Sequence, residues 1–162
     1  VQSKEIHMNI GILVYSQTGH TAEVVEKLSG KLTSKGHSVS IEKIEPEGAV
    51  NPGMKSVTFK SKPDPTPYDA VVFASPVQAF SLAVAMKYYL AQIPRIEGKK
   101  IVLLVTKQLP GRWTGGNRAV RQMARYCEEK GGDVVRSDVV FWSSKEREKD
   151  IEETVATLST AL

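Results

Sequence analysis

Short apolar runs separated by helical patterns recur along the whole chain, and this alternation constrains the fold more than any other feature. The runs are rich in β-branched residues and nearly continuous, which is typical of strands buried on both faces. Four of them are predicted to be buried strands: residues 10–15, 70–74, 101–106 and 134–142. Because strands that alternate with helices pack as a parallel sheet covered on both faces, the sequence predicts an α/β fold.

A fifth run, residues 38–44, alternates Val39 and Ile41 with polar side chains, as a strand near a sheet edge does. The helical pattern before it has apolar residues at spacings of one, three and four, and Gly36 ends it. Further helices are predicted over residues 82–92, 117–130 and 146–162. Five strands in such a chain suggest a doubly wound three-layer sandwich whose parallel sheet has the order 2-1-3-4-5.

Residues 45–67 break this rhythm, because they contain five prolines and two glycines. Proline removes a backbone donor and stops helices, so the second crossover is predicted to be irregular rather than helical. The remaining chain fits one domain of ordinary size. We interpret residues 1–7, which are polar and unpatterned, as a remnant of an expression tag ahead of an initiator Met8. The domain is then expected to span residues 8–162.

Composition excludes several classes of function. The chain is 41% hydrophobic and 25% charged, and its apolar runs are too short to span a membrane. Its net charge of +4 comes without interleaved aromatics, a helix-turn-helix or a zinc-ligand pattern, so we expect no nucleic-acid partner. A single cysteine and the lack of a secretion signal favour a cytoplasmic protein without disulfides.

The loop after the first strand has the composition of a phosphate cradle. Ser16, Thr18 and Thr21 offer hydroxyls, and Gly19 allows a tight turn in which successive amides point at one anion. The loop has no lysine and lacks the spacing of a dinucleotide site, so a phosphate monoester fits best. The alternative is an ordinary strand-to-helix turn capped by hydroxyl residues.

Six residues in this loop resemble the FMN phosphate loop of flavodoxins, which usually reads Ser/Thr-x-Thr-Gly-x-Thr. They are Ser16, Gln17, Thr18, Gly19, His20 and Thr21. The resemblance extends over residues 8–162 and implies non-covalent binding of flavin mononucleotide (FMN), with this loop around the phosphate.

Two later loops resemble the segments that hold the flavin ring in this family. The first consists of Ser75, Pro76, Val77, Gln78, Ala79 and Phe80, and the second includes Thr106, Lys107, Gln108, Gly111, Arg112 and Trp113. Phe80 and Trp113 are candidate neighbours of the ring, because a planar ring needs an apolar or aromatic slot and a few backbone hydrogen bonds.

Two departures from the family pattern bear on function. The first ring loop has no glycine, so a peptide flip to positive φ at Gln78 or Ala79 would be costly, and stabilisation of the one-electron semiquinone is in doubt. The second departure is a run of cations where flavodoxins are usually acidic: Lys107, Arg112, Arg118, Arg121 and Arg125. They could raise the flavin potential or hold an acidic partner or the 2′-phosphate of NADPH, although Arg121 and Arg125 also fit a solvated helix face.

The sequence therefore favours an FMN-binding electron-transfer flavoprotein, with a redox protein or NAD(P)H as its partner. One alternative is an NAD(P)H-dependent FMN or quinone reductase of the same fold, and a second is a non-redox domain that binds another phosphoryl ligand or a protein. No catalytic side chain and no metal ligand is assigned. Cys127 shares a helical stripe with Val120 and Met123, so it is expected in the core.

Overall fold

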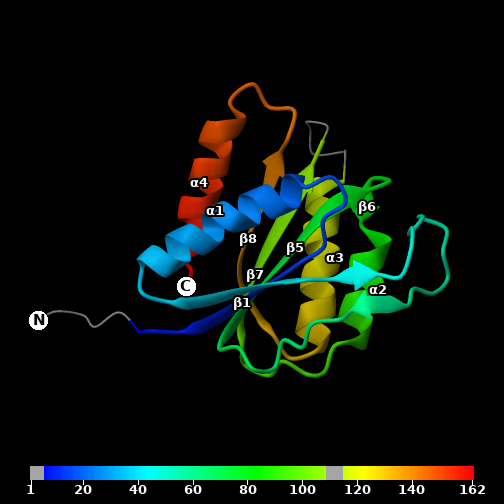
Figure 1. Ribbon diagram of the computed structural model, residues 1–162, viewed down its shortest axis with the longest axis horizontal. Coiled ribbons are helices and arrows are strands. Elements are labelled where there is room, and N and C mark those ends of the chain that lie inside the picture. Colours follow the sequence, from blue (N-terminus) through cyan, green and yellow to red (C-terminus); the bar gives the residue numbers. More distant parts are fainter. Residues whose placement is uncertain (1–5, 109–114) are drawn as a thin grey trace, which may run out of the picture.

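The structure, a computed structural model, describes residues 6–108 and 115–162 and contains a parallel sheet of order β2-β1-β5-β7-β8 (Figure 1). These strands span Ser38–Lys43 (β2), Asn9–Val14 (β1), Ala70–Gln78 (β5), Lys100–Lys107 (β7) and Asp133–Phe141 (β8). Neighbours run parallel in register, so that Ile12 of β1 lies opposite Ile41 of β2 and Val72 of β5. The predicted order 2-1-3-4-5 is confirmed.

Helices cover both faces of the sheet, which completes the predicted three-layer sandwich (Figure 1). On one face lie α1 (His20–Ser34) and α4 (Arg147–Ser159), and on the other lie α2 (Val84–Gln92) and α3 (Gly116–Glu129). The buried side chains accordingly form two separate clusters, one under each helix pair. No described helix is long and apolar enough to cross a bilayer.

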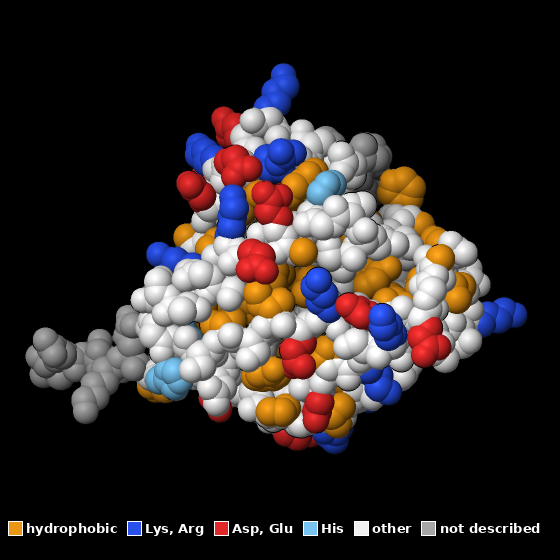
Figure 2. Space-filling view, viewed as in Figure 1, with side chains coloured by type: hydrophobic (Ala, Val, Ile, Leu, Met, Phe, Trp, Pro, Cys, Tyr) orange, Lys and Arg blue, Asp and Glu red, His pale blue; other side chains and the backbone are white. Residues whose placement is uncertain are grey.

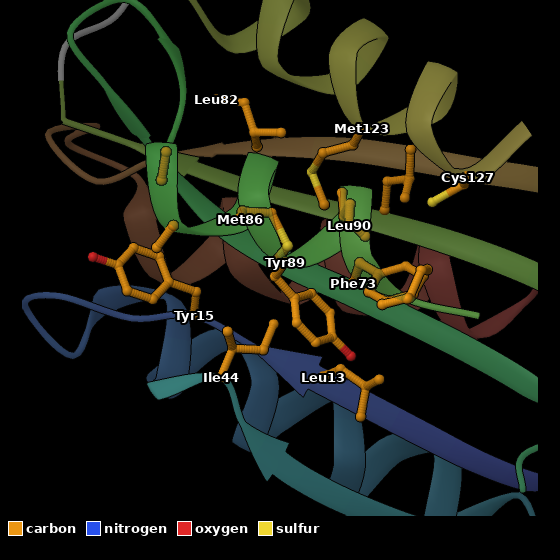
Figure 3. Packing of buried hydrophobic residues seen from close by; sticks show 14 of the residues in the cluster. Leu13, Tyr15, Ile44, Phe73, Leu82, Met86, Tyr89, Leu90, Met123 and Cys127 are labelled. Carbon is orange, nitrogen blue, oxygen red and sulfur yellow. The ribbon is translucent and has the colours of Figure 1, made fainter. Parts of the chain in front are cut away.

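Alternate residues of β1 point into the two layers. Ile12 is buried with α1 and α4, whereas Leu13 packs with Phe73, Met86 and Tyr89 on the other face (Figure 3). The Tyr89 hydroxyl donates a hydrogen bond of 2.6 Å to the carbonyl of Pro63, which ties α2 to the crossover beneath it. Cys127 also lies in this layer and is fully buried, as predicted, and burial raises the pKa of its thiol to about 12.

The second crossover contains no helix, which confirms the prediction from its prolines. Its only regular structure is a short antiparallel pair of β3 (Glu45–Pro46) and β4 (Phe59–Ser61), and residues 44–69 are all described. The segment is nevertheless packed, because Val50 and Val57 are buried against the α2 side of the sheet. The Gln78 side chain donates a hydrogen bond to the Val50 carbonyl at 3.3 Å and so joins this crossover to the end of β5.

Two sequence predictions were wrong in detail. β8 was expected to be buried, but it is the second edge of the sheet, and most of its residues, including Val134, are only partly covered. Helix α2 begins at Val84 rather than at Leu82. The reason is that Leu82 belongs to β6 (Ser81–Leu82), which pairs antiparallel with the extended end of β5.

Candidate functional site

The carboxyl ends of β1, β5 and β7 enclose a pocket, as expected where strand order reverses in a doubly wound sheet. Its lining draws on all three segments that the sequence singled out: Gln17, Thr18, His20, Pro76, Val77, Thr106, Lys107 and Gln108. Its volume is about 140 Å³. Ligand pockets typically measure roughly 300–1,000 Å³, so a nucleotide here would lie partly along the surface.

The loop between β1 and α1 contributes Gln17 and Thr18 to this pocket, and the first residue of α1, His20, also lines it. Gly19 adopts the left-handed φ of 88° before the helix begins, and its N–H donates to the Ser16 hydroxyl at 3.2 Å. No described side chain caps α1, so the amides of its first turn keep their donors available. Uncapped amides and the positive end of the helix dipole together favour an anion at this position.

Thr21 does not itself line the pocket, but it holds one of the lining residues in place. Its hydroxyl shares a buried hydrogen bond of 2.7 Å with the hydroxyl of Thr106, although the two residues are 85 positions apart. Thr21 is 1% exposed and Thr106 is 2% exposed. The pair joins the first turn of α1 to the end of β7, and Thr106 faces the pocket.

Replacing either Thr21 or Thr106 with valine is expected to lower the free energy of unfolding by about 1–3 kcal/mol, because the remaining hydroxyl stays buried without its partner. The double variant should cost less than the sum of the single ones, since both hydroxyls are then gone. Urea unfolding of the four proteins measures this coupling. Strictly additive losses would show that the hydrogen bond is not formed.

Lys107 brings a cation to the pocket from within the fold. Sequence analysis placed it in a loop, but it is the last residue of β7 and is only 5% exposed. Its Nζ lies 4.5 Å from the centroid of the Phe141 ring, which offers the charge a partly compensating π-face. Burial lowers the pKa of Lys107. A buried cation beside a pocket attracts an anionic ligand more strongly than an exposed one does, because solvent screens it less.

The expected first ring loop is a tight β5–β6 hairpin rather than an open loop. Its two turn residues, Ala79 and Phe80, have φ of 49° and 61°. Such a conformation is costly for residues other than glycine, asparagine and aspartate, and it persists where the surroundings fix it. Gln122 of α3 supplies such an anchor, because its Oε1 accepts hydrogen bonds of 2.9 Å from both the Ser81 hydroxyl and the Leu82 amide. Positive φ at Ala79, which the sequence made improbable, is thus built into this hairpin.

A close approach of α3 holds the hairpin tip from the other side. Gly115, which precedes α3, has φ of 100°, and a Cβ at this position would lie 2.5 Å from the backbone carbonyl of Phe80. The tip therefore lies directly against the start of α3. The side chain of Phe80 points away from the core and is 56% exposed.

The remaining predicted residues are more dispersed. Ser75 is fully buried and donates to the carbonyl of Pro76 at 3.0 Å, and the Gln78 side chain bonds the Val50 carbonyl and the Val84 amide. Neither lines the pocket. Ser16 and Gly19 also border a second hollow on the β2 side of the same loop. Gly111, Arg112 and Trp113 lie outside the described residues.

Sequence reasoning missed Trp142 and Arg147, which do not line the pocket but lie beside its residue His20. The His20 ring stacks on the Trp142 ring with centroids 4.0 Å apart and planes 11° from parallel. The Arg147 guanidinium lies 4.7 Å from the same ring and donates to the Trp142 carbonyl at 3.0 Å. The signal was available, since Trp142 follows β8 at the same sheet edge as the other strand ends.

The site offers hydroxyls, amides, aromatic rings and a cation. Within residues 6–108 and 115–162, no cluster of three or more His, Cys, Asp or Glu side chains could hold a metal ion. Such a donor set suits an anionic organic ligand with a phosphate group better than a metal centre.

Comparison with known proteins shows the fold. No family model matches the chain, and no curated protein matches it in sequence. Among solved structures, a flavodoxin of Streptococcus pneumonia TIGR4 aligns with a TM-score of 0.64 at 15% identity over 95% of this chain and 99% of that one. A Fusobacterium nucleatum flavodoxin bound to flavin mononucleotide aligns with a TM-score of 0.64 at 14% identity, over 94% of this chain and 95% of that one. A WrbA-like flavodoxin of Agrobacterium tumefaciens aligns with a TM-score of 0.65 at 11% identity, over 95% of this chain and 97% of that one. The chain has a flavodoxin-like fold.

Proposed function

We propose that this protein binds FMN non-covalently and transfers electrons through it. The observation that carries the proposal is a pocket at the sheet edge to which all three sequence-predicted segments contribute, beside the uncapped start of α1. The fold supports it, because the structurally similar Fusobacterium nucleatum protein was solved with FMN.

The residues present fit this cofactor. The phosphate would be held by Thr18 and the amides at the start of α1, with the Thr106 hydroxyl and the Lys107 cation nearby. The ring would meet the β5–β6 hairpin and Gln108, the first residue after β7. Bound FMN supplies the redox chemistry, and the chain contributes position and electrostatics. The positive charge of Lys107 stabilises negative charge on a ligand beside it. It therefore favours the reduced, anionic form of the flavin and raises the flavin's reduction potential.

Titration of the purified chain with FMN tests the proposal. We expect saturable one-to-one binding, seen as quenched flavin fluorescence and a shifted visible spectrum, and weaker binding of riboflavin, which lacks the phosphate. Unchanged fluorescence and absorbance after reconstitution would instead support a non-redox domain for another phosphoryl ligand or a protein.

An NAD(P)H-dependent FMN or quinone reductase is the second candidate function. The observation that favours it is the hairpin at Ala79 and Phe80, whose turn already has positive φ and is fixed on both sides, so its peptides lack the freedom to flip that would stabilise a one-electron flavin state. Stopped-flow mixing of the FMN-loaded protein with NADPH or NADH separates the two. Rapid bleaching of the flavin would identify a reductase. If the yellow colour persisted, the protein would be a carrier.

A further inference from the structure

Three arginines form a row along the exposed side of α3. Arg118, Arg121 and Arg125 follow the spacing i, i+3 and i+7, and all three are exposed. Residues 117–127 include no aspartate or glutamate. Within the part of the chain that the structure describes, none of the three forms a salt bridge. The row is therefore a patch of positive charge without ion-pair partners, about 10 Å long at 1.5 Å per residue, with Glu128 and Glu129 beyond its end.

The placement of charge on α3 is unfavourable for the helix itself. Acidic side chains stabilise the first turn of a helix and basic ones the last, because of the helix dipole. α3 has the reverse arrangement, with Arg118 in its first turn and Glu128 and Glu129 in its last. In addition, Lys87 of α2 lies near Arg118, and burial together with the charge of Arg118 lowers the pKa of Lys87. If this face of α3 had been selected only for stability and solvation, these unfavourable charge interactions would not be expected.

An exposed aromatic side chain adjoins the row. Phe80 is 56% exposed at the hairpin tip, and its backbone lies against Gly115, three residues before Arg118. Aromatic side chains and arginines are the residue types that contribute most to the binding energy of protein interfaces. The patch also borders the hairpin that forms part of the candidate cofactor site.

The opposite face of the sandwich has a different charge pattern. Over α1 and α4, basic and acidic side chains lie intermingled (Figure 2). Lys27 of α1 and Glu148 of α4 form an ion pair of 2.8 Å between the two helices. Exposed cations such as Lys31 and Lys149 on this face provide a natural comparison for those on α3.

We infer that the arginine row of α3 and the adjoining Phe80 form a docking surface for an acidic redox protein. The inference rests on the proposed function only in making the partner a redox protein. A small anion such as a nucleotide phosphate requires cations that converge, whereas these arginines are spread along a convex helix. Nucleic acid is less suitable, because a single aromatic at one end of the row gives no series of stacking platforms. An acidic protein surface matches both the length and the sign of the patch.

Binding of a plant-type ferredoxin, a small acidic iron–sulfur protein, tests the inference on the full chain. The variant R121Q/R125Q is compared with K31Q/K149Q, which loses the same charge from the opposite face. We expect the α3 variant to lower ferredoxin affinity at low salt by about tenfold or more and the control by less than about twofold. Affinity of the unmodified protein should fall steeply as salt rises.

Three results would overturn the inference: no ferredoxin binding at low salt, equal losses in both variants, or tighter binding of a short DNA duplex than of ferredoxin by the same arginines. Circular dichroism establishes that both variants fold. Each titration is run with and without FMN, so that loss of FMN binding, which refutes the proposed function, is read separately from loss of ferredoxin binding. Arg118→Glu offers a further measurement, because it should raise the melting temperature while it weakens ferredoxin binding.

Discussion

Replacing Gly115 with alanine is expected to lower the free energy of unfolding by about 2–6 kcal/mol and to weaken FMN binding at the same time. The φ of 100° alone costs an alanine about 1–3 kcal/mol. The new Cβ would also lie 2.5 Å from the carbonyl carbon and oxygen of Phe80, and backbone atoms cannot move aside as the end of a side chain can. The clash adds an overpacking penalty of about 1–3 kcal/mol. The hairpin would have to shift, and with it one side of the candidate site.

Gly36→Ala is the matched control for this prediction. Gly36 has a similar φ of 96°, but open space surrounds the position of its Cβ, and it lies at the opposite end of α1 from the site. Its substitution should therefore show the cost of backbone conformation alone and leave FMN affinity unchanged. Urea unfolding and FMN titration of both variants provide the comparison. Equal losses of stability in the two variants would mean that α3 does not approach the hairpin as closely as the structure shows.

The layers of the fold were predictable because each element carries its own periodic pattern. Strand β1 is apolar and buried from Ile10 to Val14 and lies inside the sheet, whereas β2 alternates and lies at an edge, as expected. The absence of a helix between β2 and β5 followed from the prolines. β8 was misjudged because valines occur in buried and half-buried strands alike, and Arg136 within it was the available evidence for an edge.

The site was predictable as a location but not as a set of contacts. Topology alone brings Thr18, Val77 and Thr106 to one edge of the sheet, since parallel strands end there together. Pairings such as Thr21 with Thr106 or His20 with Trp142 depend on how α1 docks on the sheet, and no local pattern encodes that docking. The hairpin was not predicted because Ala79 and Phe80 differ from the residues that two-residue hairpin turns usually contain. Only the anchor from Gln122 and the contact with Gly115 make this turn understandable.

Replacing Thr18 with aspartate is expected to lower FMN affinity by at least about 100-fold and to change riboflavin affinity little. Thr18 lines the pocket at the start of α1 and is exposed, so the substitution disturbs no packing. A carboxylate there would repel the FMN phosphate by about 4 kcal/mol per pair of unit charges at 4 Å, with an effective dielectric constant of about 20. Riboflavin carries no phosphate and escapes this repulsion. Fluorescence titrations with the two ligands measure the difference.

The fold itself should tolerate this change, because Thr18 is exposed and lies just before Gly19, the N-cap residue of α1, where a negative charge interacts favourably with the helix dipole. Thr18→Asn serves as the neutral control of nearly equal size, and it should retain FMN binding within about tenfold of the unmodified chain. Added salt should partly restore FMN binding to the aspartate variant but not alter the asparagine one, since only the former acts through charge. If aspartate weakened FMN and riboflavin equally, the phosphate would not lie at the start of α1, and the pocket would have to hold the nucleotide in another orientation.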